Sequence, residues 1–444
     1  MHDPAARNTG FPESERLARR LRTLVPGGAH AYSKTCDQWP ATAPPVLTEG
    51  HGAWVWDADG HAYVDWFAGL SCVPLGHAHP AVTAAVTAAL RRGTSFQLPA
   101  AAELAAAETF LDVVAGDEMV KFAKNASDAV DASLKLARYA TGRLLVARCA
   151  DHPFFSTGDW FIATTAASGG TLPHAAAHTL SFGYNDVPGI AALFAEHGGQ
   201  VAAVICEPVR FTKPDLVFFA ELRRLCSLHG TVLIFDETVT GMKYRLRGAR
   251  TLTGVTPDLT IWGKGIANGL PLSALTGRRD LMSLADTTRP PAPGRPGLLM
   301  LSTTHGAETA SLAAMTATVR TMADADVLTR THAIGAELRH RIEQALAAAG
   351  MAEHLILAGY DCFLGLEARD TSGTPCPQLK TLFIQEIIRG GALFRGIFYP
   401  TYAHHGPHLD LTAAAAATAA RSCARALDDG IEHHLARPVP RQIL

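Results

Sequence analysis

Val232-Leu-Ile-Phe-Asp236-Glu237-Thr-Val-Thr-Gly241 and, shortly after it, Leu259-Thr-Ile-Trp-Gly-Lys264-Gly-Ile-Ala-Asn-Gly-Leu-Pro271 are the two stretches that decide the fold. Each begins with a short apolar run, which is typical of a strand buried on both faces of a parallel sheet. A charged residue, Asp236 or Lys264, follows each run at the carboxyl end of the strand. Open α/β sheets bind ligands at that end of their strands. The two stretches therefore predict an α/β fold with a ligand site beside Asp236 and Lys264.

Apolar runs alternate with helical patterns on both sides of these stretches. Further strands are predicted at Met119–Ala123, Leu144–Arg148, Val201–Cys206 and Leu272–Thr276. Helices are predicted at Val82–Arg92, Ala101–Val114, Asp128–Ala140 and Phe218–His229. Strands that alternate with helices indicate an α/β domain with a mainly parallel central sheet.

The two ends of the chain have a different sequence pattern. The first fifty residues look irregular, and Ala53–Asp65 is predicted to be a hairpin with a type I′ turn at Asp59-Gly60. Beyond residue 310, helices at Thr309–Met322, Val327–Ala349 and Thr412–Asp429 frame a smaller α+β section. We expect an N-terminal segment (1–75) that contributes to the small domain and to substrate access, a large domain (76–310) and a C-terminal small domain (311–444).

Composition narrows the class of protein. The 444 residues include 39 basic and 41 acidic side chains, and no basic block predicts a nucleic-acid partner. No apolar run is long enough to predict a membrane span, and Met1–Arg20 lacks the apolar stretch of a signal peptide. The eight cysteines are scattered, which favours a cytoplasmic protein, and no metal site is expected.

The charged residues at the strand ends suggest a specific cofactor. A lysine between two glycines can lose its hydration and form a Schiff base, and a strand-end Asp236 suits the protonated ring nitrogen of pyridoxal phosphate. The segment Phe122–Ala129 runs from a strand into a helix, so the amides of Ala126 and Ser127 and the Ser127 hydroxyl could bind a phosphate. Each feature alone has an ordinary structural explanation: Lys264 as a lysine in a turn, Asp236 as a cap of the next turn, and the segment at Ser127 as a helix N-cap. Together they favour pyridoxal phosphate, held by Lys264.

Several motifs occur in an order that resembles the class III aminotransferases, nearest to the glutamate-1-semialdehyde aminomutase branch, over nearly the whole chain. They are Val25-Pro-Gly-Gly-Ala-His30, Leu75-Gly-His-Ala-His-Pro80, Asn125-Ala-Ser-Asp-Ala129, Cys206-Glu-Pro208, Phe235–Gly241, Gly263-Lys-Gly265 and Thr303-Thr-His-Gly-Ala-Glu308. The resemblance implies a fold type I transferase that forms a homodimer. It also implies that Glu207 lies by the phenolic oxygen of the cofactor and Thr238 under its ring, and that Thr303 of the partner subunit, with Thr304 beside it, completes the phosphate site.

The departures from that family concern the substrate. Asp151-His-Pro153 replaces the usual Tyr-His-Gly, so Phe154 or Phe155 would have to cover the ring. Lys34 stands where the aminomutases have an arginine for the substrate carboxylate. Groups that suit a polyhydroxy or cationic amine surround that position instead: Tyr32, Asp37, Gln38, Trp39 and the pair His404–His405. This segment, with Phe398-Tyr-Pro400, resembles a subgroup from aminosugar and aminoglycoside-antibiotic pathways.

Three functions are compatible with these residues. The first is an aminotransferase that acts on an amine or aldehyde carbon of an amino-sugar-like substrate. The second is an epimerase or isomerase at the same carbon, with Cys72 in Gly69-Leu-Ser-Cys72 as an acid/base opposite Lys264; Cys36 is a weaker choice, and an inert thiol is the simpler explanation. The third is a silent cofactor-binding protein, against which the presence of Lys264, Asp236 and Glu207 argues.

Overall fold

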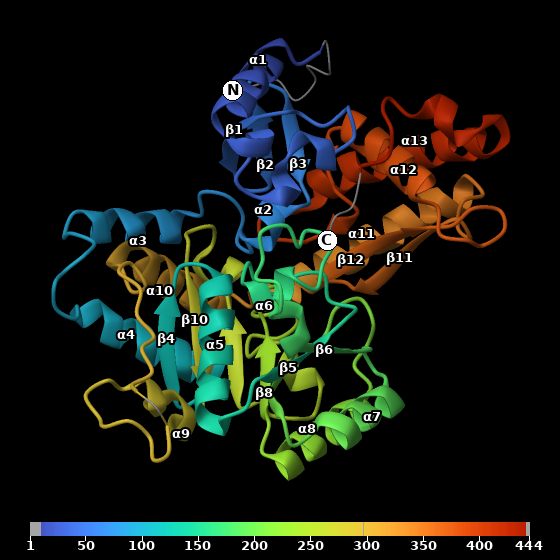
Figure 1. Cartoon of the computed structure of the whole chain (residues 1–444). Coiled ribbons are helices and arrows are strands. Elements are labelled where there is room, and N and C mark those ends of the chain that lie inside the picture. The colour runs from blue at the N-terminus through green and yellow to red at the C-terminus, as the bar shows by residue number, and fades with distance from the viewer. Residues whose placement is uncertain (1–9, 296, 441–444) are drawn as a thin grey trace. The chain divides into compact units, whose positions relative to one another are not determined.

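The computed structural model describes residues 10–295 and 297–440, which form two compact units. The small unit consists of residues up to His79 and from Thr329 onward, and the large unit consists of Pro80–Leu328. Figure 1 colours both units along the chain. In the described part of the chain, no helix combines the length and the apolar character needed to cross a bilayer.

The large unit contains a seven-stranded sheet in the order β4-β10-β9-β8-β7-β5-β6. All neighbouring pairs are parallel except those of β10, which runs antiparallel to β4 and β9. The strands are β4 (Met119–Ala123), β5 (Leu145–Cys149), β6 (Thr179–Phe182), β7 (Val201–Cys206), β8 (Val232–Asp236), β9 (Leu259–Trp262) and β10 (Ser273–Gly277). The helices are α3 (Pro80–Leu90), α4 (Ala101–Phe110), α5 (Ala126–Thr141), α6 (Asp159–Ile162), α7 (Val187–His197), α8 (Leu216–His229), α9 (Arg279–Met282) and α10 (Thr309–Asp324).

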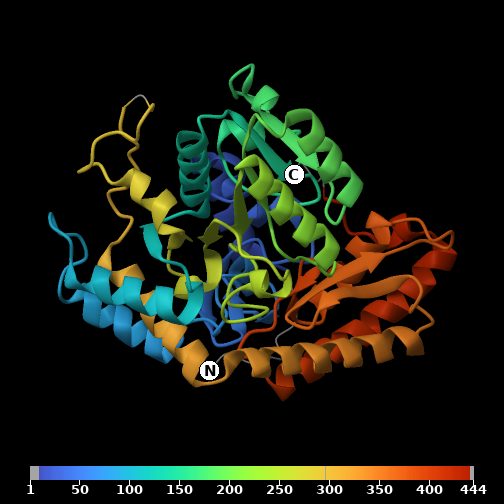
Figure 2. The same cartoon turned by 90° about the horizontal axis from the view of Figure 1, so that it is seen from below.

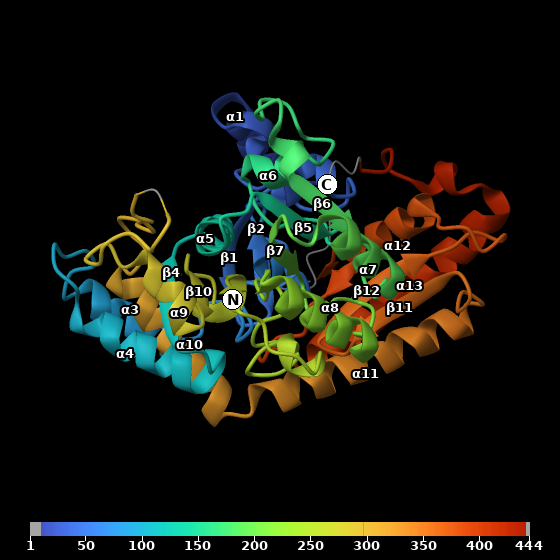
Figure 3. The same cartoon turned by 60° about the horizontal axis from the view of Figure 1, so that its bottom comes forward.

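Both faces of this sheet are covered, because successive side chains of a strand point to opposite faces. Ala203 and Ile205 of β7 join a core cluster with α5. Val204 and Cys206 of the same strand join another cluster with α7 and α8, which lie side by side in Figures 1 and 3. The continuous apolar runs in the sequence are therefore explained by a helix–sheet–helix arrangement.

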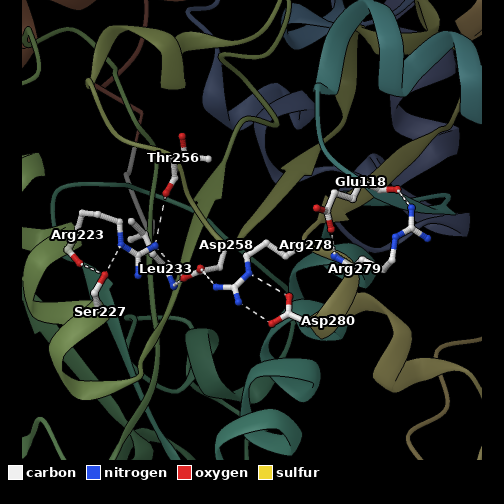
Figure 4. A network of polar contacts seen from close by, with 9 residues as sticks. All are labelled: Glu118, Arg223, Ser227, Leu233, Thr256, Asp258, Arg278, Arg279 and Asp280. Carbon is white, nitrogen blue, oxygen red and sulfur yellow. Dashed lines mark hydrogen bonds and ion pairs between the residues drawn. The ribbon is translucent and has the colours of Figure 1, made fainter.

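A charged network stabilises the amino edge of the sheet (Figure 4). Asp258, which precedes β9 and is 6% exposed, accepts hydrogen bonds from Leu233 N at 2.8 Å, Arg223 Nη1 at 2.9 Å and Arg278 Nη1 at 2.8 Å. Arg278 also bonds Asp280. A buried carboxylate needs such partners, so this edge is structural, and the opposite, carboxyl edge remains for function.

The small unit contains a four-stranded sheet, β1-β2-β3-β13, and a three-stranded sheet, β11-β12-β14. Its strands are β1 (Leu47–His51), β2 (Trp54–Asp57), β3 (Ala62–Asp65), β11 (Leu355–Tyr360), β12 (Phe363–Ala368), β13 (Ala392–Leu393) and β14 (Ile397–Phe398). Its helices are α1 (Pro12–Leu24), the single turn α2 (Ala68–Ser71), α11 (Val327–Ala348), whose first two residues belong to the large unit, α12 (Pro377–Arg389) and α13 (Gly406–Asp429). One core joins α11, α12, α13 and the strands, and Figure 2 shows α11 running along β11 and β12.

The structure differs from the sequence prediction in four places. The first fifty residues are not all irregular, since they contain α1 and β1, and β6 and α7 were not predicted. The predicted hairpin is present as β2 and β3, but the turn is not type I′, because of its two central residues only Gly60 has a positive φ. Finally, α10 belongs to the large unit, where it packs on α3 and α4, although the sequence predicts a boundary at residue 310.

Candidate active site

Three neighbouring strands, β7, β8 and β9, bring the principal polar residues to one edge of the sheet. Because they are parallel, Glu207, Asp236 and Lys264 follow or end them on the same side. Gly263 links this group to the amino end of α5: a Cβ at residue 263 would lie 3.1 Å from Thr238 Cγ2 and 3.3 Å from Ala126 Cβ. The structure therefore brings together the Asp236, Lys264 and Ala126 segments that the sequence singled out.

Asp236 is held in a low-dielectric position. It is 4% exposed, and its Oδ1 accepts a hydrogen bond from Thr238 N at 2.9 Å. Burial raises the pKa of Asp236 to about 6, with smaller opposing effects of Thr238 and Lys264. A cationic partner would favour its ionised form.

Lys264 has a strained backbone. Its φ is +45°, a left-handed value that is uncommon for residues other than glycine. The preceding Gly263 is extended, and the side chain of Lys264 is half-buried. Such strain persists where the surrounding structure imposes it, and it is concentrated at functional sites.

Glu207 is a buried carboxylate that can accept further hydrogen bonds. It is 4% exposed, Oε1 lies 3.4 Å from Arg210 Nη1, and Oε2 has no hydrogen-bond partner among the described residues. Burial raises its pKa, against the opposing charges of Arg210 and Lys264. The sequence reasoning missed two neighbours, Arg210 and His152. Arg210 had a signal, as a charged residue three positions after Glu207, and His152 had one in the Asp151-His-Pro153 motif after β5.

His152 is a neutral supporting residue. Its Nδ1 accepts a hydrogen bond from Glu207 N at 3.0 Å. Burial first, and then the charge of Arg210, lowers the pKa of His152 to about 3. The ring therefore fixes the main chain at Glu207 without adding charge.

Glu237 anchors the loop between β8 and β9. It is fully buried and accepts hydrogen bonds from Arg250 N at 2.6 Å, Ala249 N at 3.0 Å and the Thr240 hydroxyl. Burial raises the pKa of Glu237 to about 7 despite these donors. Arg250 in turn bonds Asp117 and lies over the Trp262 ring at 5.3 Å, so the network runs from the residue after Asp236 to the strand before Lys264.

The amino end of α5 offers an anion site. Ala126 and Ser127 lie in its first turn, where main-chain amides lack partners within the helix. Ser127 Oγ accepts a hydrogen bond from Thr157 N at 3.2 Å, so its own proton remains to be donated. Thr303 and Thr304 are in an exposed segment and border a cavity of about 520 Å³ that is also lined by Phe96 and Leu104.

These residues fit pyridoxal phosphate. Thr238 Oγ1 and Glu207 Oε2 are buried polar atoms without partners in the described structure, and such atoms are costly unless a ligand or water satisfies them. Thr238 lies two residues after Asp236, and Glu207 directly follows β7, the strand that pairs with the Asp236 strand β8. A cofactor with an amine-reactive carbon, a basic ring nitrogen, a phenolic oxygen and a phosphate would match the groups at this edge.

Of the two phenylalanines that the sequence suggested as a cover for the cofactor ring, Phe155 is wrong. Phe155 is 2% exposed and packs against Trp160 and Phe161 in the core, so it has no face to offer a ligand. Phe154 is 40% exposed, and its ring meets Phe161 edge-on. Phe154 therefore remains the only one of the two with an accessible ring.

In the small unit, the predicted substrate residues have different settings. Tyr32 is half-buried, Lys34 is exposed, and Asp37 forms an exposed ion pair with Arg22 at 2.8 Å. Gln38 is buried and accepts two hydrogen bonds from Arg395. His404 was wrongly placed with the exposed groups, because it is fully buried and stacked on Trp66 at 3.9 Å between ring centroids.

Cys72 follows a strained turn. Ala68, Gly69, Leu70 and Ser71 all have φ between +49° and +67°, so α2 is a left-handed turn. Each such residue other than glycine costs about 1–2 kcal/mol. Asp65 Oδ1 accepts hydrogen bonds from Phe67 N and Ala68 N at 2.9 Å, which holds the start of the turn, and Cys72 itself is half-buried.

Comparisons with known proteins agree with this geometry. The family described as Aminotransferase class-III matches residues 36–372. The chain is 38% identical over 282 residues to glutamate-1-semialdehyde 2,1-aminomutase of Chloroflexus aurantiacus, a match that covers 61% of this chain and spans 63% of that enzyme's length. The Rhodopirellula baltica enzyme of the same name is 33% identical over 367 residues, 80% of this chain and 82% of that one. The structure of the PLP internal aldimine form of the Sphingopyxis sp. MTA144 FumI protein superposes with a TM-score of 0.86 at 25% identity, covering 97% of this chain and 99% of that one.

Proposed function

Starting from the fact that this chain belongs to the class III aminotransferase family and has the fold type I architecture of pyridoxal-phosphate enzymes, we propose that it transfers an amino group at an amine or aldehyde carbon of an amino-sugar-like substrate. The substrate would lack an α-carboxylate, as in aminoglycoside-type antibiotic biosynthesis. The relatives named as aminomutases act on a different, carboxylate-bearing molecule by their name, so the proposal depends on where this chain departs from them.

The residues of the large unit have the following proposed roles. Pyridoxal phosphate, when bound, supplies an electron sink that stabilises negative charge on the carbon bearing the amine. Lys264 Nζ would hold the cofactor covalently and would move the proton at the carbon that bears the amine. Asp236 pairs with the ring nitrogen, Glu207 lies by the phenolic oxygen, and Thr238 supports the ring. Ala126 N, Ser127 N and Ser127 Oγ bind the phosphate.

One observation carries the substrate proposal: Lys34, and not an arginine, occupies the position where the relatives' carboxylate clamp is expected, and it is exposed. Among the described residues, Arg22 and Arg395 bond this segment, and both are engaged there, Arg22 with Asp37 and Arg395 with Gln38. Lysine offers a point charge rather than a planar fork, so Lys34 would hold a carboxylate only weakly, although it can donate to a hydroxyl. Tyr32 and Asp37 would accept hydrogen bonds from the hydroxyl and ammonium groups of the substrate.

We also propose a cytoplasmic homodimer in which Thr303, with Thr304 beside it, completes the phosphate site of the partner. In support, both threonines are exposed, and the exposed apolar side chains of Phe96 and Leu104 line the same cavity. Leu98, between these two in the sequence, and Met300, three residues before Thr303, are exposed as well. Neighbouring exposed apolar side chains often mark an interface.

The test compares kcat/KM for glutamate 1-semialdehyde with that for an aminomethyl sugar and its aldehyde, using the purified holoenzyme. We expect the sugar to be preferred by at least about tenfold, because Lys34 offers no fork at the position where the relatives are expected to hold this substrate's carboxylate. A clear preference for glutamate 1-semialdehyde would overturn the proposed substrate. Lys34→Arg is the matched variant, and it should shift the ratio toward the amino-acid substrate.

The left-handed turn before Cys72 favours a second candidate function, epimerisation at the amine-bearing carbon. Strained backbone at a half-buried thiol is typical of a functional position. Cys72 Sγ would then give or take the proton on the side opposite Lys264. In deuterated water without a keto acid, an epimerase inverts the amine carbon and incorporates deuterium there. Cys72→Ala should abolish that inversion and leave the amino-transfer half-reaction; unchanged inversion would exclude Cys72.

A further inference from the structure

We propose that Arg210 binds the carboxylate of the amino donor, an α-amino acid, and thereby determines donor specificity. This inference depends on the proposed amino transfer, which needs a second substrate to supply the amine. The sugar-like substrate has no carboxylate, so an arginine near Lys264 has no role in binding it. Arg210 is three residues beyond Glu207, whose carboxylate interacts electrostatically with both Lys264 and Asp236.

The guanidinium of Arg210 is oriented but mostly unsatisfied. Its single hydrogen bond among the described residues is the contact of 3.4 Å from Nη1 to Glu207 Oε1. Arginine has five N–H donors, so most of them remain available. The Arg210 side chain is 22% exposed, and its guanidinium carbon lies 5.5 Å from the centre of the Phe211 ring. A cation that is largely removed from water gains when a carboxylate supplies two parallel hydrogen bonds.

The main chain around Arg210 is fixed by three other side chains. Tyr244 donates a hydrogen bond to Arg210 O at 2.7 Å, and Tyr184 donates one to Pro208 O at 2.8 Å. His152 accepts the hydrogen bond of Glu207 N on the other side. Since ligand recognition improves when the binding group is held in advance, this segment is built to present the Arg210 side chain rather than to let it move with solvent.

The ion pair with Glu207 does not account for Arg210. An end-on contact of 3.4 Å is long for a charge-assisted hydrogen bond. For comparison, Arg224 and Glu221, at the same spacing on α8, form two hydrogen bonds of 2.7 Å. Arg210 thus lacks the fork-to-fork geometry that a purely structural pair achieves elsewhere in the chain, and a donor carboxylate could provide it.

The test uses two amines of similar size that differ in the carboxylate, L-alanine and 2-aminopropane, together with L-glutamate and L-glutamine. The amino-transfer half-reaction of the holoenzyme is followed by the loss of its visible absorbance. We expect Arg210→Gln to lower the rate constant per donor concentration by roughly 10- to 100-fold for the best amino acid. The rate with 2-aminopropane should change by less than about threefold. Arg210→Lys should fall between the two, because it keeps the charge and loses the fork.

Arg224→Gln is the matched control and should leave every donor unchanged, because its ion pair is on the exposed face of α8. A second measurement avoids turnover: the dissociation constant of maleate, an unreactive dicarboxylate, from the shift it causes in the holoenzyme spectrum. Arg210→Gln should weaken maleate binding by a similar factor. An equal loss for 2-aminopropane, or an unchanged amino-acid rate, would overturn the assignment. These donor assays contain no sugar, so a failed sugar assay in the wild type would refute the proposed substrate without affecting them.

Discussion

At the residue scale, the assignment with most consequences is Lys264. Of the eight lysines, it alone follows a buried strand between two glycines and has a positive φ at the edge that carries Asp236 and Glu207. We predict that borohydride reduction of the holoenzyme fixes the cofactor to the peptide that contains Lys264, as read by peptide mass spectrometry. Lys264→Ala should lose this label and nearly all turnover. A label on any other lysine would show that the site has been placed on the wrong strand end.

Glu237 should make stability depend on pH. Burial raises its pKa to about 7 in the folded protein, above the ordinary glutamate value of 4.5. Between these values the folded protein keeps a proton that the unfolded chain has released, so the free energy of unfolding falls as the pH rises. The full change is about 3 kcal/mol for this one group. Glu237→Gln cannot titrate, and the stability of the wild type relative to this variant should therefore fall by about 2.5 kcal/mol from pH 5 to pH 8, the rest of the change lying below pH 5.

Urea unfolding at several pH values measures the free energy of unfolding of the wild type and of the variant. Asp236 titrates in both proteins, so its contribution cancels when the two free energies are subtracted. A difference that stays flat from pH 5 to pH 8 would mean that the three hydrogen-bond donors keep Glu237 ionised throughout.

The sequence predicts the residues of the site better than it predicts their partners. Asp236, Lys264 and Ala126 could be found because each stands at a change of pattern, where a strand ends or a helix begins. Arg210 was missed although it stands only three residues after Glu207. The Glu237 network could not be found in this way, because its contacts to Ala249, Arg250 and, through Arg250, Asp117 join residues that are close only after folding. Phe155 shows the opposite error. The sequence suggested it as a cover for the cofactor ring because it is aromatic and follows the Asp151-His-Pro153 motif, but its ring is buried in the hydrophobic core.

At the element scale, helix α11 offers a test of packing in the small unit. Gly335 lies where α11 crosses the turn between β11 and β12, and a Cβ there would be only 1.7 Å from Asp361 O. A clash with main chain cannot be relieved by a rotamer change. We predict that Gly335→Ala lowers the free energy of unfolding by about 2 kcal/mol or more, as measured by urea unfolding. Gly406→Ala is the control, since nothing lies within 4 Å of its Cβ position, and it should change stability by less than about 0.5 kcal/mol.

Strands β7 and β9 of the large unit were predictable because they are buried on both faces. Both match their predicted bounds, since a run of apolar residues between polar ones leaves little choice of where a strand begins and ends. Strand β4 also matches, although exposed Lys121 interrupts it, whereas β6 and α7 were not predicted. Helix α1 and strand β1 were missed, because their outward residues are polar and their burial depends on contacts distant in the sequence, such as the hydrogen bonds from Glu13 N and Ser14 N to Asp59.

At the scale of the whole molecule, the phosphate site is expected to need residues from two chains. Thr303 is exposed in its own chain and borders two cavities, one lined by Phe96 and Leu104 and one by Asp128 and Ala129 of α5, and Ser127 lines neither. The first turn of α5 can bind a phosphate, but it supplies one hydroxyl and a few amides. We therefore expect the partner's threonine to be required, and we expect the holoenzyme to sediment as a dimer.

Complementation between two inactive variants tests this directly. Lys264→Ala removes the covalent link, and Thr303→Glu places a negative charge against the phosphate, so each variant alone should be inactive. If the site is shared, a dimer of one chain of each kind has one site with both defects and one site that is intact. Random pairing makes half of the dimers mixed, so an equal mixture should regain about a quarter of wild-type activity. If Thr303 instead served its own chain, every site in the mixture would carry one defect. No activity would then return, although the same mixed dimers would form.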